Sequence, residues 1–282
     1  MSVSVLYCEG NSGSYDIRLL RQILPKCEIK PLGGKSFMEK IIPDREVIPN
    51  LAGIVDRDFD NYDFTPTNSP LPYNYEGIQI GWKWQRKEIE NYLIDSVVVQ
   101  RTIRNKIPSM DSYRAALDEA AREIATYTAA RYALDYFKFP NSWGESMQKN
   151  VFGSEHSFPR SKNKKACQTK IREIVQNKKE VRIVTADAVL EKFEELLPSF
   201  SSGGFHFEHY LTFFAGKDLL CSMENKLKEF GFQAKASGVN SPIPDFLDQV
   251  FRKLEREEDI WKWLPEWEEL RLQFTNVNFT AC

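Results

Sequence analysis

The pattern of hydrophobic and polar residues changes near residue 95. Before that point, short apolar runs at 3–8 and 51–55 alternate with stretches in which apolar residues recur at helical spacing. Short apolar runs are typical of buried strands, and strands that alternate with helices predict a parallel sheet with crossover helices. We therefore expect residues 1–95 to form an α/β domain.

The individual elements of this domain follow from the same pattern. A helix is expected to begin at Ser14 or Asp16, whose side chains can cap it, and to end before Pro25. The other expected elements are strands at 27–30 and 78–82, a helix at 37–42, and an irregular loop with three prolines at 61–77.

Beyond residue 95 the apolar spacing is mostly helical. The Ala-rich stretch 113–136 predicts a long helix, whereas 137–165 is rich in loop-forming residues and predicts a surface segment. We therefore expect a mostly helical second domain at 96–282. Its further expected helices lie at 166–177, 186–197, 217–230 and 245–274, the last interrupted by Pro265.

Composition narrows the class of protein. Hydrophobic residues make up 42% and aromatic residues 13% of the chain, which is enough to form a core. The formal net charge is −2, so nucleic-acid binding would require a local basic patch. Five scattered cysteines favour reduced thiols, and the chain lacks a secretory signal or a membrane-spanning apolar run. We expect a cytoplasmic protein that does not enter a membrane.

Carboxylates gather where two of the expected strands end. Glu9 follows the run at 3–8, and Asp56 and Asp58 follow the run at 51–55. The C-terminal ends of parallel strands lie at one edge of a sheet and face the ligand crevice. Carboxylates gathered there repel one another, and a bound cation is the usual compensation. Because all these ligands are oxygens, the sequence predicts a site for Mg²⁺ or Mn²⁺ rather than zinc.

Other acidic residues extend the candidate site. Glu88 and Glu90 lie on an expected helix, where residues two apart point in different directions, so only one can reach the metal. Glu90 is preferred and Glu88 is the reserve. Asp60 continues the spacing of Asp58 but lies further into the loop. Asp16 is either a helix N-terminal carboxylate favoured by the helix dipole or an additional ligand.

Three motifs around these acids together resemble a known family. Their sequences are Tyr7-Cys8-Glu9-Gly10 with Ser14 and Asp16, then Gly53-Ile54-Val55-Asp56-Arg57-Asp58, then Arg86-x-Glu88-Ile89-Glu90-Asn91-Tyr92-Leu93. They resemble the Toprim-like domain of overcoming-lysogenisation (OLD) nucleases. More narrowly, they are similar to stand-alone Toprim-like proteins encoded beside an ABC-type ATPase in bacterial phage-defence systems. A later block, Gly216-Lys217-Asp218-Leu219-Leu220, is similar to another motif of that family.

The resemblance implies a Toprim-like fold and Mg²⁺- or Mn²⁺-dependent cleavage of nucleic-acid phosphodiester bonds. The family's acidic set corresponds here to Glu9, Asp56, Asp58 and Glu90. Glu9 would act as a metal ligand or a proton-transfer group, and Lys217 would neutralise charge on the transition-state phosphate. The resemblance also implies control by the ABC-type ATPase and an active homodimer.

One position departs from the family pattern. Many OLD-type enzymes carry a second acid four residues after the first Glu, where this chain has Gly13. Asp16, one turn later, is the candidate substitute. A non-catalytic Toprim-like interaction module regulated by an ATPase is therefore the alternative to a nuclease, and a Toprim phosphotransferase acting on small nucleotides is a more distant third.

The segment 160–179 is the candidate nucleic-acid contact. It is strongly basic and contains one acid, Glu173. Phosphate binding by such a segment would depend on salt and ignore sequence. The alternative is a solvated helix with a flexible basic lead-in. The candidate contact residues are Lys162, Lys164, Lys165, Lys170 and Arg172.

The remaining motifs are weaker. Residues 33–36 resemble the end of a P-loop, but Ile29 stands where that motif needs glycine. His206 and His209 have a zinc-like spacing without further ligands nearby, so a solvated loop is expected there. The tryptophans at 261–267 predict a packing stripe rather than a base-stacking platform. With the acidic residues at 255–259, they are also expected to provide a surface for self-association or for the ATPase.

Overall fold

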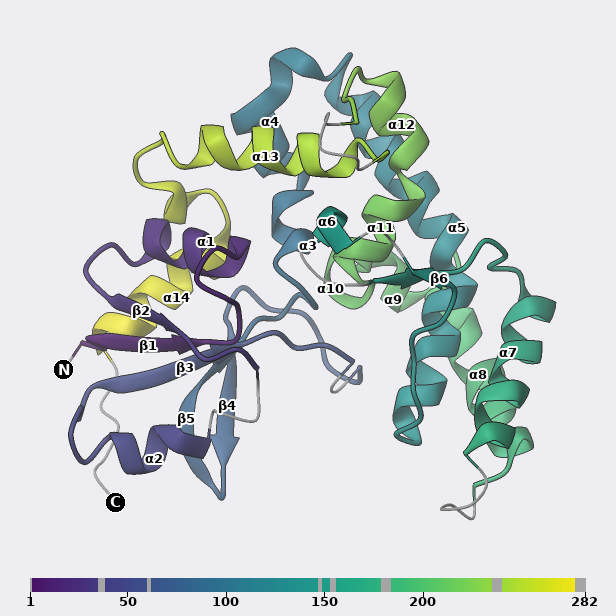
Figure 1. Cartoon of the computed structure of the whole chain (residues 1–282), viewed down its shortest axis with the longest axis horizontal. Helices are drawn as coiled ribbons and strands as arrows, with labels where there is room; N and C mark the ends of the chain where they lie inside the picture. The colour runs from purple at the N-terminus through teal and green to yellow at the C-terminus, as the bar shows by residue number, and fades with distance from the viewer. Residues whose placement is uncertain are drawn as a thin grey trace. The chain divides into compact units, whose positions relative to one another are not determined.

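Five strands form a mostly parallel sheet in the order β2-β1-β3-β5-β4 in the computed structural model (Figure 1). β1 pairs in parallel with β2 on one side and with β3 on the other, and β5 pairs in parallel with β3. β4 joins the edge in the antiparallel direction. The expected α/β class with a mostly parallel sheet is therefore confirmed. The strands are β1 (Val5–Cys8), β2 (Glu28–Pro31), β3 (Leu51–Val55), β4 (Leu71–Tyr75) and β5 (Ile78–Lys83).

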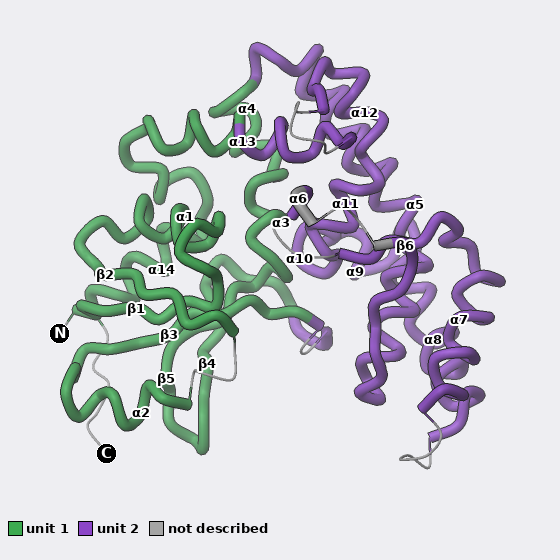
Figure 2. Tube along the Cα trace, in the orientation of Figure 1, with its two compact units in different colours: residues 1–58, 65–103, 249–282 green, residues 59–64, 104–248 purple. Residues whose placement is uncertain are grey.

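The chain divides into two compact units (Figure 2). Unit 1 contains the sheet and comprises residues 1–58, 65–103 and 249–282, whereas unit 2 comprises 59–64 and 104–248. This division differs from the expected boundary at residue 95 because the last residues of the chain return to the unit of the sheet. The structure describes residues 2–34, 39–59, 62–146, 149–152, 156–178, 184–234 and 240–276.

The crossover helices of unit 1 fix the topology of the sheet. α1 (Tyr15–Ile23) begins at Ser14, whose Oγ accepts a hydrogen bond from the Ile17 amide at 3.5 Å. α1 and α2 (Ile41–Asp44) lie on opposite faces of the sheet (Figure 1). The chain passes from β1 to β2 on one side and then back across to β3 on the other. The direction of winding therefore reverses between β1 and β3, which is where open α/β sheets place their ligand crevice.

The expected loop at 61–77 is wrong in its second half, where β4 forms a hairpin with β5. Glu76 and Gly77 form the two-residue connection, and both have positive φ angles, 50° and 83°. Such angles are what a tight hairpin loop requires. Pro72 is tolerated because β4 is an edge strand, where a proline removes no necessary ladder bond.

The C-terminal segment completes the core of unit 1. The Val3 amide donates to the Phe274 carbonyl at 3.0 Å, and the rings of Trp82 and Phe274 stack with centroids 4.6 Å apart. Trp267 is completely buried and Trp263 is 9% exposed. These two tryptophans therefore pack inside the unit, in agreement with the expected packing stripe. The elements here are α13 (Ile243–Leu254), which begins in unit 2, a 3-10 turn at Ile260–Lys262, and α14 (Pro265–Asn276).

Helices make up most of the described residues of unit 2. The long helix α5 carries buried alanines and packs against α8, close to the helices expected at these positions. The helix expected at 217–230 is divided at Met223 into two. No helix of the described residues is long and apolar enough to cross a membrane. The helices of unit 2 are α5 (Met110–Tyr136), α6 (Lys149–Phe152), α7 (Lys164–Asn177), α8 (Ala186–Phe200), α9 (Phe205–Glu208), α10 (Tyr210–Phe213), α11 (Gly216–Ser222) and α12 (Glu224–Glu229).

Three short helical elements connect the sheet to unit 2, and two short strands lie within unit 2. α3 (Glu90–Leu93) and α4 (Ser96–Ile103) belong to unit 1, and a 3-10 turn at Arg104–Lys106 follows them. β6 (Glu145–Ser146) and β7 (Ser157–Phe158) form a two-stranded ladder inside the expected surface segment.

Candidate functional site

Glu9 and Asp56 lie at the same end of two neighbouring parallel strands. Cys8 at the end of β1 is in register with Ile54 of β3, so Glu9 follows β1 close to the point where Val55 and Asp56 leave β3. Both acids are therefore at the C-terminal edge of the sheet, at the position where its winding reverses. The two strand-end acids expected from the sequence are brought to one place.

Asp16 joins these two acids. A Cβ built on Gly10 would lie 3.2 Å from Asp16 Oδ2, so the carboxylate approaches the backbone just after Glu9. Burial raises the pKa of the Cys8 thiol, and the negative charges of Asp16, Asp56 and Glu9 raise it further. All three carboxylates are thus close enough to act on one thiol at the end of β1.

Glu90 and Glu88 differ in burial. Glu90 is the first residue of α3 and is 5% exposed, whereas Glu88 precedes the helix and is half-buried. Burial raises the pKa of the Tyr15 hydroxyl to about 12, Arg18 opposes the rise, and the negative charge of Glu90 adds to it. Glu90 therefore lies near Tyr15, which is the first residue of α1 and directly precedes Asp16.

The Asp56–Asp58 segment is a turn rather than the end of a strand. β3 ends at Val55, and Asp58 has a left-handed backbone with φ 51°. The Arg57 Nε donates to the Gln85 carbonyl at 2.6 Å, the Lys87 Nζ donates to the Asp58 carbonyl, and the Asp58 amide donates to the Lys87 carbonyl at 3.4 Å. This clamp holds Asp56 half-buried and Asp58 exposed, so the two acids do not share one strand face.

Sequence patterns missed the two cations of this clamp. Arg57 and Lys87 are each only 1% exposed. Charged side chains are almost never fully buried unless they are paired, so a sequence pattern assigns them to the surface. Arg57 stands between the two aspartates, and that position in the motif is the only sequence signal that could have marked it.

The donor chemistry of this edge fits a hard divalent cation. One carboxylate oxygen of each of Glu9, Asp56 and Glu90 is shielded from solvent, and all three residues also interact with neighbouring groups. Among the described residues, however, no three His, Cys, Asp or Glu side chains are grouped so that they could hold a metal. Mg²⁺ commonly binds through one or two carboxylates together with waters and substrate phosphates. The residues therefore fit a site that the substrate completes, and not a preformed protein cage.

Two other candidate residues, Lys217 and Asp60, lie outside the described part of unit 1. Lys217 is half-buried in α11 of unit 2, next to the buried Asp218. Asp60 lies outside the described residues. Lys35 and Ser36 of the P-loop-like segment also lie outside them.

Acids from other parts of unit 2 pair with three of the seven described cations of the basic segment. Glu123, Glu145 and Glu194 supply negative charge that the local sequence does not contain. Three of the cations, Lys165, Arg172 and Lys178, have no ion pair with a described residue. The ion pairs are Arg160–Glu145 at 2.7 Å, Lys162–Glu123 at 2.9 Å, Lys164–Glu194 at 2.6 Å and Lys170–Glu173 at 2.9 Å.

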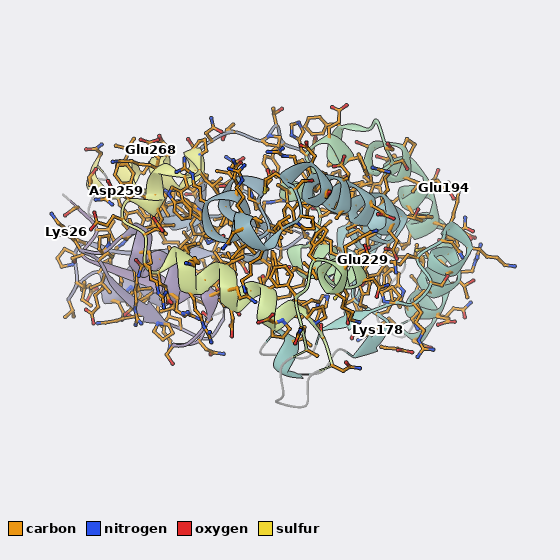
Figure 3. The ribbon with its side chains drawn as sticks, turned by 90° about the horizontal axis from the view of Figure 1, so that it is seen from above. Lys26, Lys178, Glu194, Glu229, Asp259 and Glu268 are labelled. Carbon is orange, nitrogen blue, oxygen red and sulfur yellow. The ribbon has the colours of Figure 1, made fainter. Side chains whose placement is uncertain are left out.

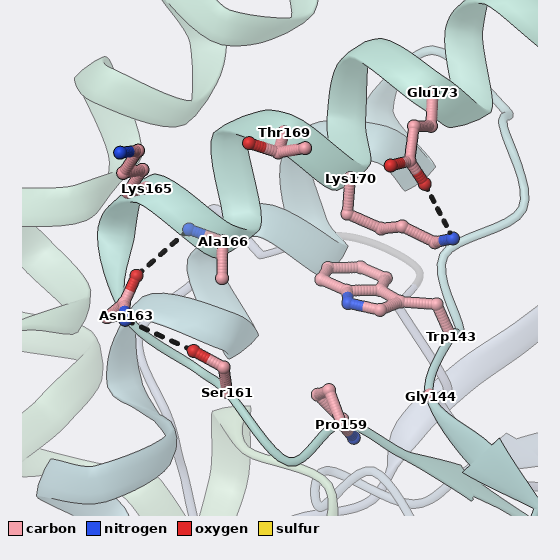
Figure 4. Close-up of a pocket in the computed structure, with 10 residues that line it drawn as sticks. All are labelled: Trp143, Gly144, Pro159, Ser161, Asn163, Lys165, Ala166, Thr169, Lys170 and Glu173. Atoms are coloured by element: carbon pink, nitrogen blue, oxygen red, sulfur yellow. Dashed lines mark hydrogen bonds and ion pairs between the residues drawn. The ribbon is translucent and has the colours of Figure 1, made fainter.

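A pocket of about 530 Å³ lies at the start of α7 (Figure 4). Trp143 and Pro159 line one side and the first turns of the helix line the other. Asn163 caps the helix by accepting the Ala166 amide at 2.9 Å. Lys165 and Lys170 both line the pocket, so part of the expected nucleic-acid contact borders this open, shallow pocket.

A buried charge network in unit 2 was not expected from the sequence. Asp218 on α11 accepts hydrogen bonds from Arg131 on α5 and pairs with His156 Nε2 at 3.0 Å. Burial raises the pKa of Asp218, but attraction to Arg131 and His156 outweighs burial, so its pKa lies below the ordinary value. The network ties the Gly216–Leu220 block to the long helix.

His206 is not the solvated residue that the sequence predicts. It is 8% exposed and its ring stacks on Phe200 with centroids 4.3 Å apart. Its Nδ1 pairs with Ser199 Oγ at 2.6 Å, and its Nε2 pairs with the Tyr62 carbonyl at 2.9 Å. His206 is therefore a core residue that holds Tyr62 in unit 2.

Comparison with models of known protein families and with curated proteins found no match to the chain.

Proposed function

We propose that the protein is a Mg²⁺- or Mn²⁺-dependent Toprim-type nuclease that cleaves phosphodiester bonds of nucleic acid. The observation that carries this proposal is the placement of Glu9 and Asp56 at the ends of adjacent parallel strands, where the winding of the sheet reverses. Asp16 adds a third carboxylate beside Gly10. Acid clusters at a sheet edge of this kind suit phosphate chemistry, because a cation is needed to bring an anionic substrate to them.

The protein's own residues would divide the work. Glu9 and Asp56 would hold the metal, with Asp58 and Glu90 as further ligands. A metal bound there would supply Lewis-acid stabilisation of the phosphate. Arg57 and Lys87 keep the Asp56–Asp58 turn in one conformation and so orient the ligands. Glu9 could also transfer a proton to or from the reacting oxygen. Lys217 would neutralise charge on the phosphate.

The wider role follows from the resemblance in the three motifs. We propose that the protein is the effector of an anti-phage defence system, that an ABC-type ATPase restrains it, and that it acts as a homodimer. Phosphate contacts would come from the α7 region, where Lys165 and Arg172 have no ion pair with a described residue and Lys164 and Lys170 form exposed ion pairs. Lys162 lies beside them, but its side chain is only 10% exposed. Surface pairs are worth only about 0–1 kcal/mol, so nucleic-acid phosphates can replace the carboxylate partners.

A cleavage assay tests the proposal. The full chain, with and without the neighbouring ATPase, is incubated with total RNA and with plasmid DNA in Mg²⁺, Mn²⁺ or EDTA. We expect metal-dependent cleavage that Glu9→Gln and Asp56→Asn abolish while the melting temperature is unchanged or higher, since rim repulsion is relieved. Glu28→Gln is the matched control, because Glu28 lies at the start of β2, at the opposite end of the strands from Glu9 and Asp56, and this variant should cleave normally.

A non-catalytic interaction module is the second candidate. Two observations favour it: Gly13 replaces an acid of the family pattern, and no three described acids are grouped to hold a metal. Cleavage by Glu9→Gln at the wild-type rate, or no cleavage under any of these conditions together with tight binding to the ATPase, would support this second candidate.

A further inference from the structure

Unit 2 contains a second pocket, of about 280 Å³, that is dominated by aromatic side chains. Phe59, Tyr62, Tyr132 and Tyr136 line it together with the carboxylates of Asp63 and Asp135. The pocket contains none of the acids assigned to the metal site and none of the basic residues of α7. The pocket is therefore separate in composition from both of these candidate sites.

The inner wall of this pocket is fixed and its mouth is open. Tyr132 is 1% exposed and its hydroxyl donates to the Phe213 carbonyl at 3.0 Å. Phe59 packs edge-on against Tyr132, with ring centroids 4.8 Å apart. Tyr136, by contrast, is 54% exposed. A large exposed aromatic side chain beside a rigid aromatic wall offers a flat ligand a face on which to stack.

Cations accompany the aromatic faces. The Lys192 Nζ lies 5.3 Å from the ring centre of Tyr62 and 4.7 Å from that of Tyr136, and it pairs with Glu195 at 2.6 Å. Lys138 lines the pocket with a side chain that is 68% exposed. Aromatic faces accept bases of any sequence, and lysines attract the backbone phosphates.

The position of the pocket along the chain connects it with the acidic motif. Phe59 is covalently joined to Asp58, the last acid of that motif, and neighbouring Cα atoms are about 3.8 Å apart. A paired base has both faces and its hydrogen-bonding edge occupied by the duplex, so only an unpaired or extruded base can enter.

We infer that this aromatic pocket is a nucleobase subsite, and that the substrate is a nucleic acid with an unpaired nucleotide, such as a single strand or a loop, rather than an uninterrupted duplex. The inference rests on the proposed nuclease function for its substrate class, but it concerns binding and does not need cleavage.

Binding by the full chain in EDTA tests the inference, with fluorescence anisotropy of a labelled single-stranded oligonucleotide and of a blunt duplex with the same number of phosphates. We expect tighter binding of the single strand. Tyr136→Ala should weaken that binding by about 5- to 150-fold, which is the usual range for losing one base–aromatic stack, and should leave the weaker duplex binding unchanged. Tyr136→Phe keeps the ring and should bind as the wild type does.

The control is Tyr75→Ala, which removes a half-buried tyrosine from the edge hairpin of unit 1. Equal affinity for both probes, no binding of the single strand, or unchanged single-strand binding by Tyr136→Ala would overturn the inference. Failure of the nuclease proposal gives a different result: selective, Tyr136-dependent binding without cleavage in Mg²⁺. Cleavage with no dependence on Tyr136 would refute the pocket alone.

Discussion

At the scale of single residues, Glu266 shows how one buried carboxylate can order a functional segment. It lies on α14, accepts the Gln85 amide at 2.7 Å and accepts the Tyr92 hydroxyl at 2.7 Å. Burial raises the pKa of Glu266, and the hydrogen bonds from Gln85 and Tyr92 and the charge of Arg86 only partly oppose the rise. The segment it holds contains Lys87 and Glu90, so a residue far along the chain positions the candidate site.

Glu266→Gln provides the first stability prediction. The amide has one acceptor oxygen, so the Gln85 amide or the Tyr92 hydroxyl loses its partner, and the free energy of unfolding should fall by about 1–3 kcal/mol. Because the folded pKa of Glu266 is raised, the folded state holds its proton more tightly than the unfolded state does. The wild type therefore loses stability as pH rises from the ordinary Glu pKa through this raised value, and the variant does not.

Urea unfolding at a series of pH values measures this difference. The loss caused by Glu266→Gln should be largest at the acidic end and should shrink as pH rises. Glu268→Gln, an exposed neighbour on the same helix (Figure 3), is the control and should change little. A loss that is the same at every pH would show that the proton on Glu266 does not contribute.

At the scale of elements, the sequence could predict what is decided locally. β1 and β3 are buried along their whole length, so each appears in the sequence as an uninterrupted apolar run. The place of Glu9 and Asp56 directly after these strands could therefore be predicted. Features that depend on distant partners could not be predicted. Pro72 indicated a loop because its place at the edge of the sheet is not visible locally. Buried Lys87 and the acids that pair with the basic segment depend on contacts across the chain.

Gly81→Ala tests how β5 holds β3 in place. A Cβ on Gly81 would lie 1.9 Å from the Gly53 carbonyl oxygen, so even a methyl group must push the two strands apart. We expect a loss of about 1–3 kcal/mol or more in unfolding free energy, measured with urea, and reduced activity because Asp56 follows the displaced strand.

Gly13→Ala is the matched substitution in the same unit. A Cβ on Gly13 meets nothing within 4 Å, so stability should stay equal or rise by about 0.4–1 kcal/mol. Equal losses for Gly81→Ala and Gly13→Ala would contradict the close approach of β3 and β5.

At the scale of the whole molecule, unit 1 is built from three separated pieces of the chain. The final piece contributes Trp267, which is completely buried, and Trp261, which is half-buried and stacks against Arg271. Burial identifies Trp267 as a core residue, although its sequence neighbourhood equally suggested an interface.

Trp267→Ala and Trp261→Ala separate these two roles. Trp267→Ala should lower the free energy of unfolding by about 3–5 kcal/mol, because it leaves a large cavity. Trp261→Ala should lower the free energy of unfolding much less, since part of the surface of Trp261 already faces solvent. Unfolding in urea and mass by light scattering measure both effects. An unchanged stability with a reduced mass for Trp267→Ala would mean that it anchors an assembly instead.

The return of the chain to unit 1 has a consequence for its synthesis. The hydrogen bond between Val3 and Phe274 joins the segment before β1 to α14, so this contact can form only after residue 274 has been made. While the ribosome is still translating the inserted unit 2, the sheet has neither Glu266 nor Trp267 to complete its core. We therefore expect the edge of the sheet that carries Glu9 and Asp56 to become fully ordered only after residues 249–276 have been made. A fragment that stops before residue 249 lacks these contacts, so we expect it to leave the edge of the sheet that carries Glu9 and Asp56 incompletely formed.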